Sequence, residues 1–200
     1  MNASKSTAQP APTAWLADDF GPTHPAHQVV DFWQAAGASR WFAKDPVFDS
    51  DFQQRFQHLH FAAARQECSH WLADPKAGLA LILLLDQFPR NVFRGTAHMF
   101  ATDPLARQYA HVFLDAGLID QLDIELQTFA CVPFMHSESL DDQEYSLVLY
   151  KRYAPGSMRW ADDHHDIIRR FGRFPHRNAS MARITTAQEQ AFLDAGGFAG

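Results

Sequence analysis

The chain lacks several features that identify large protein classes. Its 200 residues include only two cysteines, Cys68 and Cys131, which lie far apart and form no Cys-x-x-Cys pair. Neither a disulfide framework nor a thiolate metal site is therefore expected, and a reducing cytoplasm is the natural location. The longest apolar run, residues 79–85, is far shorter than the roughly 20 residues that a membrane-spanning helix needs. We expect a cytoplasmic protein without a membrane segment.

Excess basic charge is also missing. The formal net charge is -6, from 17 Lys and Arg against 23 Asp and Glu, which argues against a general nucleic-acid-binding surface. Residues 1–14 are rich in Ser, Thr, Pro and Ala and carry one charge, Lys5, so we predict a disordered tail rather than a targeting segment. The remaining residues, 15–200, are predicted to form a single domain, because 46% of the chain is hydrophobic and such a chain can bury one core.

What the chain does contain is helical periodicity. Pro and Gly fall between segments whose apolar residues recur at helical spacing, and no segment alternates as a strand would. The sequence therefore predicts an all-α fold of seven to nine helices in stacked antiparallel hairpins. No repeat of constant period, of the kind that defines a regular solenoid, is present.

Specific residues predict where these helices begin and end. Gly37 is expected to end a first helix. Pro89 and Pro133 are expected to end two later helices, because the residue before a proline is restricted to extended geometry. Two capping boxes are predicted, at residues 139–142 and 186–189, because a Ser or Thr is followed three residues later by an acidic residue.

Two segments concentrate hydrogen-bonding side chains. In both, an apolar helix runs into Phe-Pro, followed by Arg and Asn: "LLLDQFPRN" at 83–91 and "RRFGRFPHRN" at 169–178. In one interpretation these side chains satisfy the carbonyls of terminated helices. In the other they build a site, because so many polar groups beside apolar segments are costly to bury without partners. The polar residues concerned are Asp86, Gln87, Arg90, Asn91, Arg170, Arg173, His176, Arg177 and Asn178.

The arginines suggest an anion site. A guanidinium matches two oxygens of a carboxylate or phosphate at once. Arg90, Arg173 and Arg177 lie near chain breaks and are predicted to hold a small anion. Arg170 is instead predicted to pair with Asp166 at i,i+4 spacing on one helix face.

The histidines suggest acid–base chemistry. His136 and His176 each lie at a break in the helical pattern and are followed by a polar residue, and histidine exchanges a proton near neutral pH. Ser137 is interpreted as a helix cap, because the chain has no Gly-x-Ser-x-Gly elbow. No metal site is expected, because "DDHHD" at 162–166 lacks the His-Glu-x-x-His spacing of zinc enzymes.

These motifs together resemble a known family. The pieces "VVDFW", "WFAKDPVFDSDFQQRF", "LALILLLDQFPRNVFRGTAHMFATDPLA", "VPFMHSESLDDQ" and "HHDIIRRFGRFPHRNASMARITTAQEQAFL" occur in order from residue 29 to 193 and resemble the bacterial domain of unknown function 924 family. The resemblance implies a tetratricopeptide-like helical superfold and no established activity. The resemblance implies a glycine at position 182, where this chain has Ala182. The polar signature that it implies falls on Asp86, Gln87, Arg90, Asn91, His136, Ser137, Glu138, His165, Arg173, His176, Arg177 and Asn178.

Two functional hypotheses follow. In the first, the chain holds a small anionic molecule or catalyses a hydrolase or lyase reaction, without an organic cofactor because no Gly-rich phosphate loop is present. Its catalytic residues would be His176, His136 and Asp86. Its ligand-binding residues would be Arg90, Asn91, Arg173, Arg177, Asn178, Gln87, Glu138 and His165. In the second, a helical scaffold binds a peptide or protein partner, and the polar motifs are structural staples.

Overall fold

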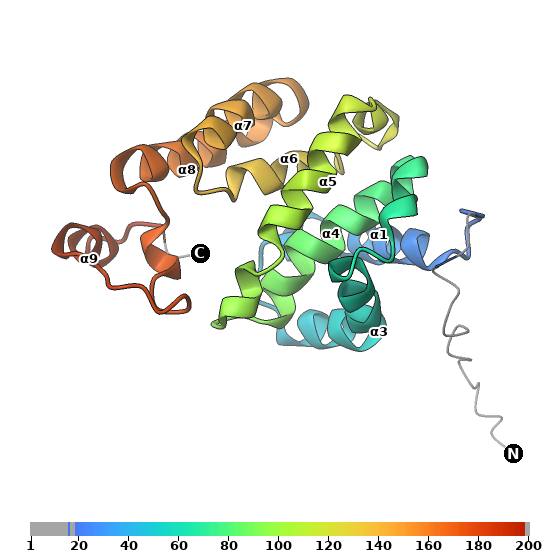
Figure 1. Cartoon of the computed structure of the whole chain (residues 1–200), viewed down its shortest axis with the longest axis horizontal. Coiled ribbons are helices and arrows are strands. Elements are labelled where there is room, and N and C mark those ends of the chain that lie inside the picture. The colour runs from blue at the N-terminus through green and yellow to red at the C-terminus, as the bar shows by residue number, and fades with distance from the viewer. Residues whose placement is uncertain (1–15, 17–18, 199–200) are drawn as a thin grey trace, which may run out of the picture.

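The described part of the chain is entirely helical. A computed structural model describes residue 16 and residues 19–198, and within them there are α-helices and 3-10 helices but no strands (Figure 1). The predicted all-α fold is confirmed for these residues, and the predicted tail at 1–14 lies outside them. The α-helices are α1 (Pro25–Ala36), α2 (Ala38–Trp41), α3 (Pro46–Ala64), α4 (Pro75–Val92), α5 (Asp103–Asp115), α6 (Thr128–Met135), α7 (Leu140–Tyr153), α8 (Met158–Phe171) and α9 (Ala187–Asp194). The 3-10 helices are η2 (Ser69–Ala73), η3 (Ala97–Phe100), η4 (Leu118–Gln121), η5 (Pro155–Ser157) and η6 (Pro175–Arg177).

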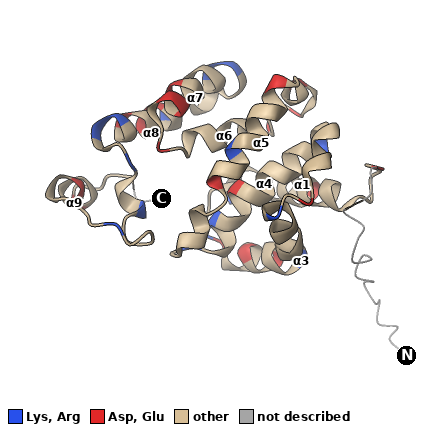
Figure 2. Ribbon diagram, viewed as in Figure 1, with Lys and Arg blue, Asp and Glu red and all other residues tan. Residues whose placement is uncertain are grey.

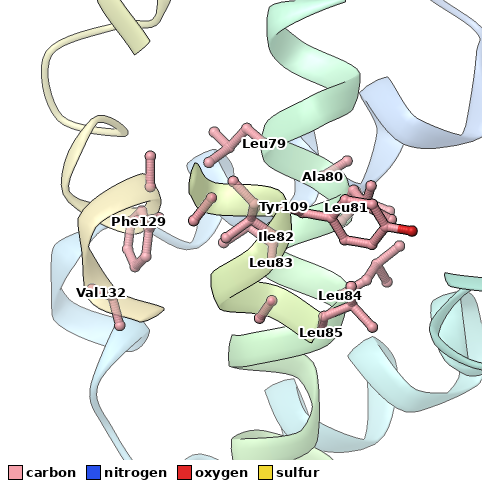
Figure 3. Close-up of a cluster of buried hydrophobic side chains, with 14 of the residues drawn as sticks. Leu79, Ala80, Leu81, Ile82, Leu83, Leu84, Leu85, Tyr109, Phe129 and Val132 are labelled. Carbon is pink, nitrogen blue, oxygen red and sulfur yellow. The ribbon is translucent and has the colours of Figure 1, made fainter. Parts of the chain in front are cut away.

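Helix α4 is the centre of the core. It packs against α1, α3, α5 and α6, and its residues 77–89 are all buried. A helix that is apolar on every side is expected to be surrounded in this way. Figure 3 shows the leucines of α4 beside Tyr109 of α5 and beside Phe129 and Val132 of α6. The polar end of α4, which begins at Asp86, is thereby fixed next to α5 and α6.

Consecutive helices pack as hairpins. Contacts join α3 to α4, α4 to α5, α5 to α6, α6 to α7 and α7 to α8. Only residues 154–157 connect α7 and α8, so these two helices run antiparallel. Ile167 and Ile168 of α8 form a second, small apolar cluster with Phe174. Figure 1 shows η6 and α9 beside the end of α8.

Two predicted helix ends are wrong, because the prolines lie inside helices. Helix α4 continues past Pro89 to Val92. Proline has no N–H to donate to the carbonyl four residues earlier, that of Leu85, and the Thr102 hydroxyl donates to that oxygen instead, at 2.5 Å. Helix α6 likewise continues past Pro133 to Met135. It begins only at Thr128, and η4 precedes it in the chain.

One of the two predicted capping boxes is present. Thr186 and Glu189 bond reciprocally at the start of α9, as predicted. Ser139 makes no side-chain cap at the start of α7. Asp142 instead accepts a 2.6 Å hydrogen bond from the hydroxyl of Ser137, and this earlier serine also accepts from the Ser139 backbone N–H at 3.1 Å.

Candidate functional site

A buried carboxylate and a histidine form the centre of the candidate site. Asp86, on α4, is 1% exposed and accepts hydrogen bonds at 2.9 and 3.1 Å from Nδ1 of His136, at the end of α6. Gln87 donates a further hydrogen bond to Asp86 at 2.7 Å. Because a carboxylate only accepts, His136 carries its proton on Nδ1. Its Nε2 has no hydrogen-bond partner among the described residues, and the side chain is 14% exposed.

The charges around this pair fix its protonation. Burial alone would raise the pKa of Asp86, but Arg90 and His136 outweigh it, and the pKa lies below the usual range. Burial, followed by the positive charge of Arg90, lowers the pKa of His136, although Asp86 opposes this shift. At neutral pH Asp86 is therefore ionised and His136 is neutral, with a free acceptor at Nε2.

Asp103 bridges two arginines beside this pair. Arg90 donates to both carboxylate oxygens of Asp103, at 2.8 and 2.9 Å, and lies 3.2 Å from Asp86. Arg177, on η6, donates to Asp103 at 3.3 Å and to the carbonyl of His136 at 2.9 Å. The α4, α5, α6 and η6 segments are thus joined through one network of four charges. Two arginines and two aspartates give it no net charge.

Arg177 is held between two aromatic rings. Its guanidinium lies 4.6 Å from the ring centre of Phe100 and 4.4 Å from that of Phe174, at the distance of a cation–π contact. The side chain is 7% exposed. Burial, followed by the charge of Arg90, lowers the pKa of Arg177 to about 10, so the group is still charged at neutral pH. Its Nε is buried and has no hydrogen-bond partner among the described residues.

Arg173 and Asn178 belong to a second network. Arg173 donates to the two oxygens of Glu189 at 2.5 and 2.8 Å and to the carbonyl of Ile184 at 2.8 Å. Asn178 donates to the same carboxylate at 3.3 Å. The Arg173 hydrogen bond is the main cause that lowers the pKa of Glu189 to about 2. This network attaches α9 to the η6 segment, and it does not bring Arg173 to the Asp86–His136 pair.

Two further predicted site residues are paired elsewhere. Glu138 accepts two hydrogen bonds of 2.8 Å from Arg183 and one of 2.9 Å from the backbone of Phe174. Asn91 points to α3, where it donates to Asp49 at 2.7 Å. These bonds connect elements of the fold. Asn91 is thus separated from its neighbour Arg90.

His176 lies in an aromatic cluster near the pair. Its ring is 5.1 Å from that of Phe198, which is 4.6 Å from the ring of His164; His164 is in turn 6.3 Å from His136. Burial, followed by nearby charged groups, lowers the pKa of both His164 and His176 to about 3. Nδ1 of His176 is buried without a partner in the described part of the chain. His165 is half-buried, and no hydrogen bond or ring contact among the described residues links it to these groups.

Asp103, His164 and Phe100 also contact this cluster, although the sequence does not single them out as site residues. Asp103 precedes Pro104 at the start of a predicted helix, where an aspartate is an ordinary helix-starting residue. Its partners are 13 and 74 residues away, a separation that no local motif indicates. His164 is next to His165, which the family resemblance indicates, and the rotation of about 100° between neighbouring residues of α8 decides that His164 is the more buried of the two.

One surface cleft lies apart from these groups. It has a volume of about 490 Å³ and is lined by Arg170, Phe171, Gln188, Ala191, Phe192 and Ala195. Arg170 is paired with Asp166 at 3.3 Å, as predicted. In the described residues no group of three or more His, Cys, Asp or Glu side chains is arranged to hold a metal ion. Figure 2 shows acidic and basic residues distributed over several helices.

The fold and this network define an all-helical protein with a buried carboxylate–histidine–arginine cluster. The chain belongs to the family described as bacterial protein of unknown function (DUF924), whose model matches residues 29–197. It is similar to a solved structure, that of the protein of unknown function ATU0120 from Agrobacterium tumefaciens, with 47% identity and a TM-score of 0.83 over 86% of this chain and 97% of that one. No curated protein matches the chain. Among the described helices, none has the length and apolarity needed to cross a bilayer.

Proposed function

We propose that this protein is a cytoplasmic, cofactor-independent hydrolase or lyase that acts on a small hydroxyl-bearing monocarboxylate, with His136 as the proton acceptor. The supporting observation is the Asp86–His136 hydrogen bond of 2.9 Å, because it leaves Nε2 of a neutral imidazole without a partner. An imidazole oriented in this way by a carboxylate is suited to general base catalysis. The Asp86 carboxylate then stabilises the imidazolium that forms.

The charge balance favours a single carboxylate over a phosphate. Arg90 and Arg177 are already neutralised by Asp86 and Asp103. A polyanion would meet two carboxylates, and their repulsion offsets the attraction of the arginines. The remaining hydrogen-bond donor is Nε of Arg177, which can bind one oxygen of the ligand. A ligand hydroxyl that donates a hydrogen bond to Nε2 of His136, and a ligand carboxylate that accepts one from Nε of Arg177, would give each of these two nitrogens a partner.

His176 has a different role in this proposal. Its pKa of about 3 makes it neutral across the physiological range, so it accepts or donates a hydrogen bond and does not act as a general acid. Gln87 fixes the second oxygen of Asp86. Arg173, Asn178, Glu138 and Asn91 hold the surrounding elements together through the carboxylate and backbone partners described above.

Thermal unfolding in the presence of lactate, acetate and inorganic phosphate tests the proposal. The variants are His136→Gln and, as the matched control, His165→Gln on α8. A ligand at about 100 times its Kd adds about 2.7 kcal/mol to the free energy of unfolding, which raises the midpoint of a 200-residue protein by about 5–10 °C. We expect lactate to stabilise the wild type and His165→Gln, and to lose this effect in His136→Gln. An equal effect on His136→Gln would contradict the assignment.

A helical scaffold for a peptide or protein is the second candidate. It is favoured by the pairing of Arg173 with Glu189 and of Arg183 with Glu138, which resembles a set of staples more than an open site. Under this alternative His136→Gln loses stability, and none of the three compounds shifts the midpoint of the wild type.

A further inference from the structure

The segment that follows α9 places an aromatic ring on the candidate site. Phe198 packs at 4.6 Å from the ring of His164, tilted by 59°, and edge-on at 5.1 Å from the ring of His176. Phe174 lies within 5.6 Å of both imidazoles. Three rings from α8, η6 and the segment between them therefore form a receptacle that holds a fourth.

Two glycines direct the chain back to this receptacle. Gly196 adopts a left-handed conformation, with φ of 79°, and the N–H of Gly197 donates to the carbonyl of Phe192 at 3.0 Å, as in a Schellman helix end. A Cβ on Gly197 would lie 2.5 Å from the Phe192 ring, so the close approach needs glycine. The path of residues 195–198 is thus built by specific local bonds.

The receptacle is suited to a ring that is bound reversibly. Phe198 is only partly buried, and it is tied to the fold by ring contacts and by a short segment. The ring of His176, which Phe198 contacts, carries the buried Nδ1 that has no partner in the described residues. Such an unsatisfied buried group calls for a hydrogen-bonding partner. A ligand with a ring and a polar group satisfies the site more fully than phenylalanine does.

We propose that His164, Phe174 and His176 form a subsite for an aromatic ring of the ligand, and that Phe198 fills this subsite as an internal competitor. The inference deepens the proposed function and rests on it for the reacting end of the ligand: the preferred ligand is an aryl-bearing hydroxy acid. Phe198 must leave before such a ligand binds. The observed affinity is therefore reduced by the fraction of molecules in which Phe198 occupies the subsite.

Calorimetric titration of the whole chain with 3-phenyllactate and lactate tests the subsite. These probes share the hydroxyl and the carboxylate and differ in the ring. We expect Phe198→Ala to bind 3-phenyllactate about tenfold more tightly than the wild type does, a change of about 1.4 kcal/mol, and to bind lactate unchanged. Phe42→Ala is the matched control, because this exposed phenylalanine contacts neither histidine ring. The result that would overturn the proposal is equal affinity of wild type and Phe198→Ala for 3-phenyllactate, or no binding of it by either.

Further variants test the aromatic subsite independently of the proton-acceptor role of His136. Phe198→Leu retains apolar volume without the ring and is expected to show the same preference, should Phe198→Ala not fold. His136→Gln is added to Phe198→Ala: retained discrimination between the two probes supports the subsite even where the proton-acceptor role fails. Loss of that discrimination when His164 is replaced by leucine is also expected. Unchanged discrimination in His164→Leu would count against the subsite.

Discussion

Removal of the Asp103 carboxylate is predicted to destabilise the fold strongly. Asp103 accepts hydrogen bonds from Arg90 at 2.8 and 2.9 Å and from Arg177 at 3.3 Å. In Asp103→Ala, Arg177 is left 7% exposed without a paired carboxylate, and it keeps only a backbone carbonyl and two aromatic rings as contacts, whereas Arg90 keeps Asp86. Removing one partner of a buried ion pair costs about 3–5 kcal/mol. Because Arg90 keeps a carboxylate partner, we expect a loss at the lower end of this range, about 3 kcal/mol.

Urea and thermal unfolding measure this loss. About 3 kcal/mol lowers the midpoint of a chain of 200 residues by about 6–12 °C. The control is Asp166→Ala, which removes an exposed carboxylate from two exposed arginines and is expected to cost less than about 1 kcal/mol. Losses of similar size in the two variants would refute the account of Asp103 as the bridge of a buried network.

Further predictions concern pH, capping and backbone strain. The pKa of His164 is about 3 in the fold, against 6.5 for an unperturbed histidine, so the unfolded state binds a proton first as pH falls. His164 therefore contributes a decline in the free energy of unfolding of up to about 1.4 kcal/mol per pH unit below pH 6.5. Urea titrations should show that His164→Gln makes the total decline shallower by this amount, while His176, whose pKa is also about 3, keeps its own share; an unaltered slope is the contrary result. Thr186→Ala is expected to lose about 1 kcal/mol through its capping bond, whereas Ser139→Ala, which makes no cap, should change thermal stability little; equal losses would mean that the cap at Thr186 is not the cause. Ala182→Gly should raise the free energy of unfolding by about 1 kcal/mol, because Ala182 has a φ of 53° and the left-handed backbone is strained for alanine. Ala179 has no positive φ, so Ala179→Gly should not stabilise the fold; an equal gain in that variant would show that backbone strain is not the cause.

Local signals in the sequence predicted the helices better than their ends. The all-α class follows from helical periodicity, and the Thr186–Glu189 box is a contact across three residues. The predicted helix end at Pro89 was wrong, because the Thr102 hydroxyl donates to the Leu85 carbonyl in place of the N–H that proline lacks. The glycine that the family resemblance implies at position 182 agrees with the left-handed backbone there.

The candidate site could be predicted in its residue types but only partly in its pairings. Asp86, Arg90, His136 and Arg177 do converge. Neighbours in one motif nevertheless separate, because a helix turns about 100° per residue, so consecutive side chains face different elements. The carboxylate of Asp103 satisfies both arginines, and its distance along the chain hides this from any local pattern.

The most direct test of the central claim is a nitrogen-15 NMR spectrum of the histidine rings, recorded near neutral pH with and without lactate. Comparison with His136→Gln assigns the His136 signals. We expect a neutral ring with the proton on Nδ1, held by Asp86, and an Nε2 signal that shifts when lactate is added while the His165 signals do not. A protonated Nε2, or an Nε2 signal that lactate leaves in place, would contradict the assignment of His136 as the proton acceptor of a ligand site.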